Sequence, residues 1–308
     1  MCLPAIHAVR ETYRESEITL LLQKGQAPLL EGHPDLDRII EWDPAEGSGW
    51  KSFFRWGRIL RAERFDTAVV FNPSRFFHAA SFLARIPIRV GYRRKWGFLL
   101  NRSIEDSKNR RTLHEVEYNL ELARLLETKP GPAVFELPPQ AAWEETADRI
   151  LLSHGIPHSV RPVAIHPWTS NPVKSWPLES FLELGGRLSK KGYPVLIIGA
   201  AQTAEQAASW TKSIPSGLTD LVGQVPLGAL PGILRRCRLL ISNDSGPTHI
   251  AAAVGTYTIV VAPKNHGPLL NRWKPWGCEN RILLSPSVQE TETAAEKRLL
   301  EKEEQPSP

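Results

Sequence analysis

The chain has 308 residues, 42% of them hydrophobic and 23% charged, which is the composition of an ordinary folded protein and excludes a disordered or fibrous one. The length predicts two domains of about 150 residues each. The net charge of +5 at pH 7 favours an anionic partner, but charge alone does not choose between nucleic acid, a membrane surface and a phosphorylated substrate.

The cysteines and the apolar runs bear on the compartment. Cys2, Cys237 and Cys278 form no C-x-x-C pair, so neither a zinc knuckle nor a disulfide framework is predicted, and a reducing compartment is favoured. No run of 18 apolar residues occurs, and the residues after Met1 lack the pattern of a secretory signal. We therefore expect a cytoplasmic protein that does not span a membrane.

Apolar periodicity in the first half predicts alternating helices and strands. Helices are expected at residues 3–13, 50–64, 78–83 and 108–126, and strands at residues 17–22, 38–42, 67–71 and 89–92. Such alternation builds a mostly parallel sheet flanked by helices. A doubly wound half normally begins with a strand in the middle of its sheet, whereas here a helix comes first. We therefore predict that this half lacks its first strand.

The second half repeats the pattern and predicts a second doubly wound domain. Helices are expected at residues 140–154, 178–190, 203–214, 227–236 and 248–254, and strands at residues 162–166, 193–199, 238–242 and 258–262. The final segment is rich in Glu, Lys and Ser and predicts a solvated helix with a frayed tail. The predicted division is 1–150, 151–285 and 286–308.

The strongest local signal lies at residues 241–253, where a buried strand ends and a helix begins. In this segment Ser245 can cap the helix, Gly246 lets a ligand approach the backbone, and His249 can donate to a phosphate oxygen. Asp244 directly precedes the cap. The pattern indicates a diphosphate site, and the alternative, an ordinary capped helix with a buried histidine, stays open.

A second polar loop follows the strand at residues 162–166. It carries Thr169, Ser170 and Lys174, which supply neutral donors and a positive charge for phosphate, although a polar loop with a solvated lysine is an equal alternative. Because both loops leave parallel strands at the same sheet edge, one ligand can contact both. Glu205 follows a third strand end and can accept from ribose hydroxyls, although a surface role is the commoner one.

Two further patterns lie in the first half. Asp35 and Asp37 form a D-x-D, but we expect them to cap a turn rather than to hold a metal. Arg93, Arg94 and Lys95 belong to a basic, aromatic-bearing stretch that can bind an anionic glycolipid at a membrane surface. Solvated positive surface is an equal alternative. Nucleic acid would use the same residue types, but no recognised module for it appears, and we expect no nucleic-acid partner.

Several ordered blocks together resemble a known family. The blocks are His166-Pro-x-x-Ser-x-x-x-Lys-x-Trp-Pro, Ile197-Ile-Gly-Ala, Asp220-Leu-Val-Gly-Gln and Ser242-Asn-Asp-Ser-Gly-Pro-Thr-His, with Leu3-Pro-Ala-Ile and His114-Glu-Val-Glu-Tyr-Asn upstream. Each block is weak alone. In combination they resemble the lipopolysaccharide heptosyltransferases, glycosyltransferase family 9, over nearly the whole chain.

The resemblance implies an α/β fold of the GT-B type, with two Rossmann-like domains facing a central cleft and the donor held mainly by the second. It implies inverting transfer of a heptose or related sugar from an ADP-sugar to a lipopolysaccharide-type acceptor, without a metal or other cofactor. We expect a monomer, with the inner face of the inner membrane as a peripheral location.

The resemblance also assigns residue roles. The expected contacts are Thr169, Ser170, Lys174, Ser245, Gly246 and His249 with the donor phosphates, Asp244 with the sugar, and Glu205 with the ribose. Arg93, Arg94 and Lys95 stay the acceptor-side candidates on the basis of their charge. The family's expected general base is an aspartate before the Leu-Pro-Ala helix, upstream of Met1, so no catalytic residue is assigned. The alternatives are a nucleotide-sugar-binding homologue without transfer activity, or another nucleotide-sugar GT-B enzyme such as an epimerase.

Overall fold

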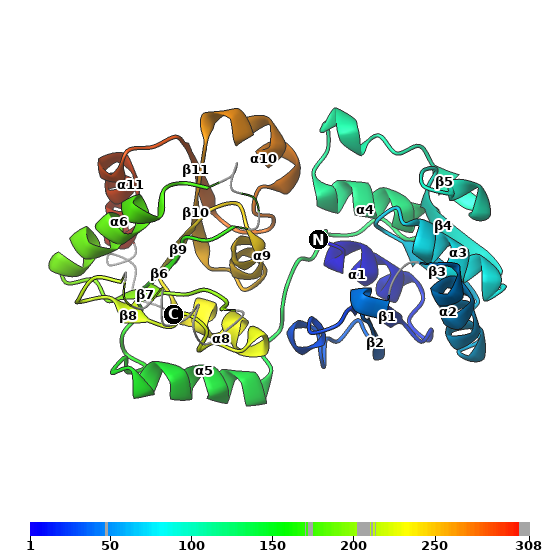
Figure 1. The fold of residues 1–308 in the computed structure, drawn as a ribbon, viewed down its shortest axis with the longest axis horizontal. Coiled ribbons are helices and arrows are strands. Elements are labelled where there is room, and N and C mark those ends of the chain that lie inside the picture. Colours follow the sequence, from blue (N-terminus) through cyan, green and yellow to red (C-terminus); the bar gives the residue numbers. More distant parts are fainter. Residues whose placement is uncertain are drawn as a thin grey trace. The chain divides into compact units, whose positions relative to one another are not determined.

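The structure is a computed structural model that describes residues 1–46, 49–169, 171, 175–201, 210, 212 and 214–301. The chain forms two compact units, Met1–Val134 and Phe135–Pro308, which we call the first and the second unit (Figure 1). Every strand pair in the described residues is parallel. The predicted fold class, α/β with helices around parallel sheets, is confirmed.

The first unit alternates helices and strands, as predicted. Its elements are α1 (Leu3–Thr12), β1 (Thr19–Gln23), β2 (Arg38–Trp42), α2 (Trp50–Ala62), β3 (Thr67–Val70), α3 (Arg75–Leu83), β4 (Ile88–Tyr92), β5 (Arg102–Ile104) and α4 (Glu115–Arg124). The helix expected from residue 108 begins only at Glu115, because His114 caps it: its Nδ1 accepts the Val116 N–H (3.2 Å), and Glu117 accepts the His114 N–H (2.7 Å). β5 was not predicted.

The strands of the first unit form two separate sheets, β1-β2 and β3-β4-β5. Helices α2 and α3 cover one face of both, through a cluster that contains Trp56 and Phe76 and extends to Leu21 on β1 and Ala68 on β3. The other face carries a second cluster around Tyr92 on β4 and residues of α4. Within the described residues β1 pairs only with β2, and the missing first strand stays a prediction.

The second unit has one continuous sheet of six strands, in the order β11-β10-β9-β6-β7-β8. Its elements are α5 (Ala141–Ser153), β6 (Val163–His166), α6 (Leu178–Lys190), β7 (Val195–Ile197), β8 (Thr219–Asp220), α8 (Leu230–Arg236), β9 (Leu239–Ser242), α9 (Gly246–Ala253), β10 (Tyr257–Ala262), α10 (Gly267–Trp273), β11 (Asn280–Leu284) and α11 (Val288–Glu301). The helix expected at 203–214 lies mostly outside the described residues. β8, α10 and β11 were not predicted.

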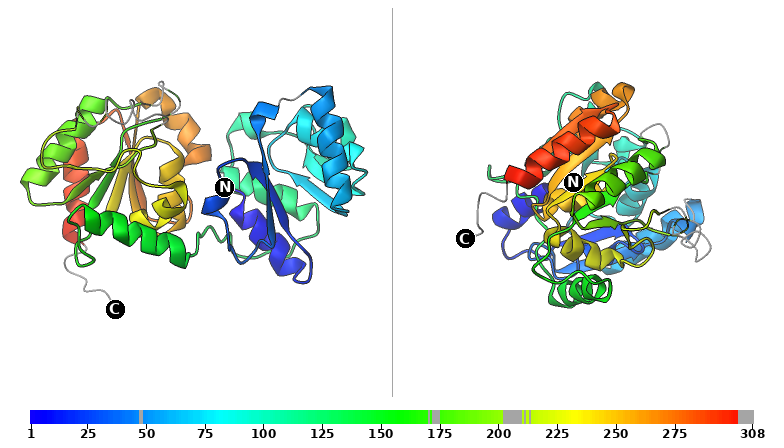
Figure 2. Two further views of the ribbon diagram at one scale, coloured as in Figure 1. Left: turned by 60° about the horizontal axis from the view of Figure 1, so that its bottom comes forward. Right: turned by 90° about the vertical axis from the view of Figure 1, so that its left-hand side faces the viewer.

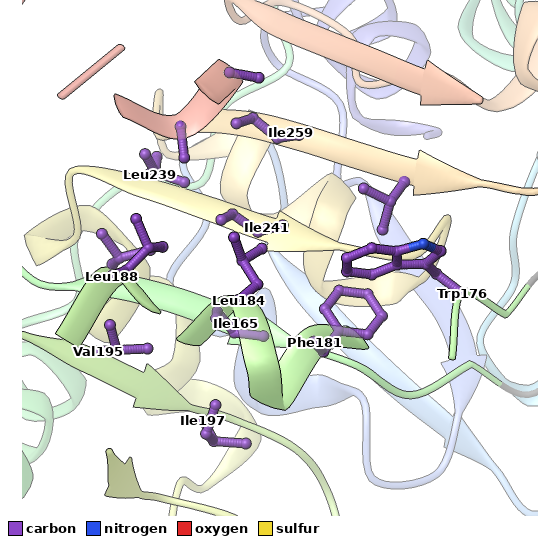
Figure 3. Packing of buried hydrophobic residues seen from close by; sticks show 14 of the residues in the cluster. Ile165, Trp176, Phe181, Leu184, Leu188, Val195, Ile197, Leu239, Ile241 and Ile259 are labelled. Atoms are coloured by element: carbon purple, nitrogen blue, oxygen red, sulfur yellow. The ribbon is translucent and has the colours of Figure 1, made fainter. Parts of the chain in front are cut away.

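Both faces of this sheet are buried, because successive strand residues enter opposite clusters. Val163 and Ile165 of β6 join the cluster under α6 and α11, while Ala164 joins the one under α5, α8 and α9. Figure 2 shows the strands between the two helix layers. Figure 3 shows the first cluster, in which the rings of Trp176 and Phe181 meet edge to face with centroids 4.8 Å apart.

The predicted domain boundary at residue 150 is wrong, because α5 belongs to the second unit. It lies along α8 (Figure 1), and Arg236 on α8 donates to both carboxylate oxygens of Asp148 on α5 (2.6 and 2.7 Å). A Cβ on Gly228 would lie 2.3 Å from the ring of Trp143, so the two segments are in close contact. The connection is the extended stretch before α5.

The last helix is also not solvated all round, contrary to the prediction. Ala295 and Leu299 of α11 are buried in the cluster under α6. Glu292 is buried as well, and it accepts from Lys191 (2.7 Å) and Arg187 (3.1 Å) at the end of α6. α11 is therefore part of the second unit.

Candidate functional site

The candidate site lies where three neighbouring strands of the second unit end. β10, β9 and β6 are adjacent and parallel, so their carboxyl ends reach the same edge of the sheet. Ligands of open α/β sheets bind at such edges. The three ends are His166, Ser242 and Ala262, and the described polar side chains around them contact one another directly.

Asn243, in the corner after β9, contacts the loop between β6 and α6. Its Oδ1 accepts the Trp176 N–H (2.8 Å), and its Nδ2 donates to the Pro167 carbonyl (2.6 Å). Asn243 is fully buried, so both bonds are shielded from water. The loop between β6 and α6 is thus tied at both ends to the segment that opens α9. Asn243 is not among the predicted site residues, although it lies inside the strongest motif.

His166 joins the same two segments from the strand side. Its Nδ1 lies 3.3 Å from the Ser242 Oγ and 3.2 Å from the Ser245 Oγ, and the two hydroxyls are 3.1 Å apart. Burial lowers the pKa of His166 to about 4, so the ring is neutral at pH 7. A neutral ring nitrogen can accept a hydrogen bond from one of these hydroxyls.

The prediction that Ser245 caps α9 is wrong. Ser245 occupies the N-cap position, but its side chain makes no capping hydrogen bond, because its Oγ lies against His166 and Ser242. Gly246, the first helical residue, is exposed, and a Cβ added there would meet nothing within 4 Å. The start of α9 therefore presents exposed backbone that no Ser245 side chain covers.

The segment after β10 contributes His266, which is not among the predicted site residues. Its Nε2 lies 2.9 Å from the Oδ2 of Asp244, and both side chains are buried. His266 follows β10, so this contact joins the segment after β10 to the corner after β9. Asp244 is held in one orientation by this bond, and its predicted contact with the donor sugar stays a prediction. The one feature of the sequence that could have indicated His266 is its position just after the buried strand β10.

The remaining predicted donor residues fall into two groups. Thr169 is partly exposed, and its Oγ1 accepts the Asn171 N–H (3.4 Å) within the loop after β6. His249 is partly buried in the first turns of α9. Ser170, Lys174 and Glu205 lie outside the described residues.

The end of β7 reaches the same edge through a close contact between Gly199 and Trp168. A Cβ on Gly199 would lie 2.4 Å from two ring carbons of Trp168, so the indole occupies the space that a side chain at residue 199 would need. The Trp168 ring also meets Trp210, with centroids 4.8 Å apart. Aromatic side chains therefore line the edge beside the polar residues.

The predicted acceptor residues lie between β4 and β5 of the first unit. Arg93, Arg94 and Lys95 are exposed, and Arg94 forms an ion pair with Asp106 (3.0 Å). Lys95 and Trp96 have φ angles of 46° and 70°, a left-handed conformation that is uncommon for residues other than glycine. The Nδ1 of buried His78 lies 3.0 Å from the Lys95 carbonyl oxygen, which anchors this turn.

The D-x-D aspartates have structural partners. Asp35 contacts His7 (3.0 Å), and Asp37 accepts the Ile18 N–H (2.7 Å). Among the residues that the structure describes, no group of three His, Cys, Asp or Glu side chains could hold a metal ion. No helix within the described ranges is long and apolar enough to cross a membrane.

Solved structures with the same arrangement define the fold. The crystal structure of the glycosyl transferase family 9 protein from Veillonella parvula DSM 2008 matches with a TM-score of 0.84 and 20% identity, over 97% of this chain and 93% of that one. ADP-heptose LPS heptosyltransferase II of E. coli matches with a TM-score of 0.80 and 20% identity, over 98% of this chain and 95% of that one. The fold is that of the GT-B heptosyltransferase structures.

The sequence comparisons define the family. The family model for glycosyltransferase family 9 (heptosyltransferase) matches residues 53–303. Lipopolysaccharide heptosyltransferase 2 of Salmonella typhimurium is 26% identical over 261 residues, which cover 80% of this chain and 74% of that protein. The chain belongs to glycosyltransferase family 9. The predicted family and enzyme class, a transferase, are confirmed.

Proposed function

We propose that this glycosyltransferase moves a heptose or a related sugar from an ADP-sugar to a lipopolysaccharide-type acceptor, with inversion and without a metal ion. The observation that carries the donor half is the set of direct side-chain bonds among the ends of β6, β9 and β10. Two of these segments are joined in each case by Asn243, His166 or His266. The segments around the backbone at Gly246 are therefore held in place.

The chemistry of this edge suits a diphosphate. The amino-terminal end of α9 carries a partial positive charge and exposed backbone at Gly246, and negative charge is stabilised there. His249, in the same helix, can donate to a phosphate oxygen. The resemblance adds Thr169, Ser170 and Lys174 from the loop after β6, and Asp244 for the sugar hydroxyls.

The proposed reaction is a single displacement. An acceptor hydroxyl attacks the anomeric carbon, the bond from that carbon to the diphosphate oxygen breaks, and the electron pair leaves with ADP. The charge that develops on the leaving group is stabilised by the start of α9, His249 and Lys174. The proton of the attacking hydroxyl goes to a general base.

The names of similar proteins support the choice of substrates. The E. coli structural neighbour is called an ADP-heptose LPS heptosyltransferase, and the Salmonella relative is called a lipopolysaccharide heptosyltransferase. Both names point to a heptose donor and to a lipopolysaccharide acceptor for those proteins. The same substrate classes are what we propose for this chain.

The test begins with binding. We expect ADP to bind the purified protein in isothermal titration and to raise its melting temperature, with UDP and GDP much weaker. His249→Ala should weaken ADP binding, whereas the control His158→Ala, on an exposed histidine of the same unit, should not. Equal binding of the three nucleotides, or ADP binding unaffected by His249→Ala, would overturn the donor assignment.

Transfer is measured separately, as ADP release from ADP-heptose in the presence of a heptose-free lipopolysaccharide acceptor. His249→Ala and Lys174→Ala should each lower kcat by about 10²-fold. Lys190→Ala, on an exposed lysine of α6, is the matched control for the lysine. ADP binding with no transfer in the unmodified protein would instead identify a nucleotide-sugar-binding protein.

A further inference from the structure

The outer face of α2 in the first unit combines exposed aromatic and basic side chains. We call Trp50, Lys51, Phe54, Arg55 and Arg58 the α2 face. These residues are exposed and follow helical spacing, while Trp56, Gly57 and Leu60 on the opposite side are buried against the unit's core. The α2 face therefore points away from the hydrophobic core of the first unit.

Its aromatic residues are unusually open to solvent. Trp50 is 69% exposed and Phe54 is 53% exposed, and their rings meet edge to face with centroids 5.9 Å apart. Exposing two large apolar rings side by side is unfavourable in water, and such a pair is typical of a surface that becomes covered by a partner. Together with Ile59 they border an open groove of about 560 Å³.

The charged residues on α2 itself are all positive. Residues 50–62 contain four cations, Lys51, Arg55, Arg58 and Arg61, and no carboxylate. In the described part of the chain, no carboxylate forms an ion pair with Lys51, Arg58 or Arg61. Arg10 on α1, by contrast, forms an ion pair with Asp37. Lys51 and Arg58 of the α2 face therefore carry positive charge that no described carboxylate neutralises.

A neighbouring turn extends this surface. The ring of Phe53 on α2 lies edge to face with Trp96, with centroids 5.9 Å apart, so the turn at residues 93–98 adjoins the helix. Trp96 is 40% exposed and Phe98 is 78% exposed, and Arg93 and Lys95 are exposed beside them. The His78 contact with the Lys95 carbonyl holds the turn in place.

We propose that the α2 face, with the turn at 93–98, docks the first unit onto an anionic lipid bilayer. Amphipathic helices that lie in a membrane interface have the same composition, with aromatic rings inserted below the headgroups and Lys and Arg beside the lipid phosphates. The charge complementarity selects anionic over neutral lipid. Nucleic acid fits less well, because Trp50 and Phe54 pack edge to face with each other and do not form a flat stacking platform.

The experiment is vesicle co-sedimentation of the full protein without any nucleotide, so that it does not depend on the proposed donor site. We expect binding to vesicles that contain phosphatidylglycerol, little binding to pure phosphatidylcholine, and a decrease at high salt. Lys51→Glu with Arg58→Glu should weaken binding more than about tenfold, since each cation contributes about 1 kcal/mol near such a surface. Trp50→Ser with Phe54→Ser should weaken it as well.

Matched controls are Lys190→Glu and Leu152→Ser, which change an exposed lysine and an exposed apolar residue of the second unit. A second readout is quenching of tryptophan fluorescence by brominated acyl chains, which should fall in Trp50→Phe. ADP binding should be unchanged in all variants. Equal binding to neutral vesicles, equal losses in the controls, or unchanged binding in both double variants would overturn the proposal.

Discussion

The two units differ in how far their parallel strands are buried. In the second unit every residue of β6 and β9 is buried, whereas in the first unit no residue of β1 is buried and only Val70 of β3 is. The cause is the continuity of the sheet. The second unit has one sheet of six strands, whereas the first unit has two short separate sheets. A buried, continuous sheet holds the strand ends of the candidate site in fixed positions.

The exposed aromatic residues follow the same division. Among the described residues, every exposed large aromatic side chain belongs to the first unit: Tyr13, Trp50, Phe54, Phe82, Trp96 and Phe98. The exposed large hydrophobic residues described in the second unit are all leucines, namely Leu152, Leu284 and Leu300. The division matches the two proposals, which put the donor site in the second unit and the membrane-docking surface in the first.

The largest expected effect tests the difference in packing. Phe181→Ala in the second unit should lower the free energy of unfolding by about 3–5 kcal/mol, because the side chain is fully buried beside Trp176. Leu21→Ala on β1 should cost much less, since that residue is only partly buried. Denaturant unfolding of both variants measures this. Equal losses would contradict the comparison.

A second prediction concerns pH. Burial lowers the pKa of His166 in the folded protein to about 4, below the value of about 6.5 in the unfolded chain, so the unfolded chain binds the extra proton first as pH falls. The stability that depends on neutral His166 is complete above about pH 6.5. It should decrease by up to about 3 kcal/mol between pH 6.5 and 4.

The measurement is denaturant unfolding across that pH range. His166→Gln should show a shallower loss of stability toward pH 4 than the unmodified protein, whatever its stability at pH 7. His158→Gln, at a largely exposed histidine, should keep the full dependence. Parallel curves for the unmodified protein and His166→Gln would show that His166 is not the group responsible.

A third prediction tests the bonds of Asn243. Asn243→Ala leaves the Trp176 N–H and the Pro167 carbonyl without their partner, which should cost about 1–3 kcal/mol and weaken ADP binding. Gln224→Ala, which removes an exposed amide in the same unit, should change the free energy of unfolding by less than about 0.5 kcal/mol. If the two variants behave alike, Asn243 does not hold the loops together.

The smallest expected change in stability is at Gly246. Gly246→Ala should alter the free energy of unfolding by less than about 0.5 kcal/mol, because a Cβ there meets nothing within 4 Å. ADP affinity should nevertheless fall if the diphosphate approaches this backbone. Thermal melting and isothermal titration on one preparation separate the two effects. Unchanged affinity would remove Gly246 from the donor site.

Much of the fold was predictable because its signals are local. β2 and α6 have the predicted bounds, since apolar spacing marks both. The boundary at residue 150 failed because the ion pairs between α5 and α8 involve residues nearly ninety positions apart, such as Asp148 and Arg236. Short strands such as β8, with two residues, leave too little pattern to recognise.

The candidate site shows the same limit. Parallel strands predicted that the loops after β6 and β9 share one edge, and the bonds of Asn243 confirm that these segments meet. The partnership of His266 with Asp244 was missed because it depends on β10 lying beside β9, which no local pattern states. The roles predicted for Ser170, Lys174 and Glu205 stay predictions.

The contact between Gly199 and Trp168 has a consequence for sequence change in this protein. Any larger residue at position 199 would collide with the indole, and a smaller residue at position 168 would remove the collision. The two positions should therefore be replaced together or not at all as the protein diverges. A variant with both changes should fold, whereas a variant with the substitution at position 199 alone should not.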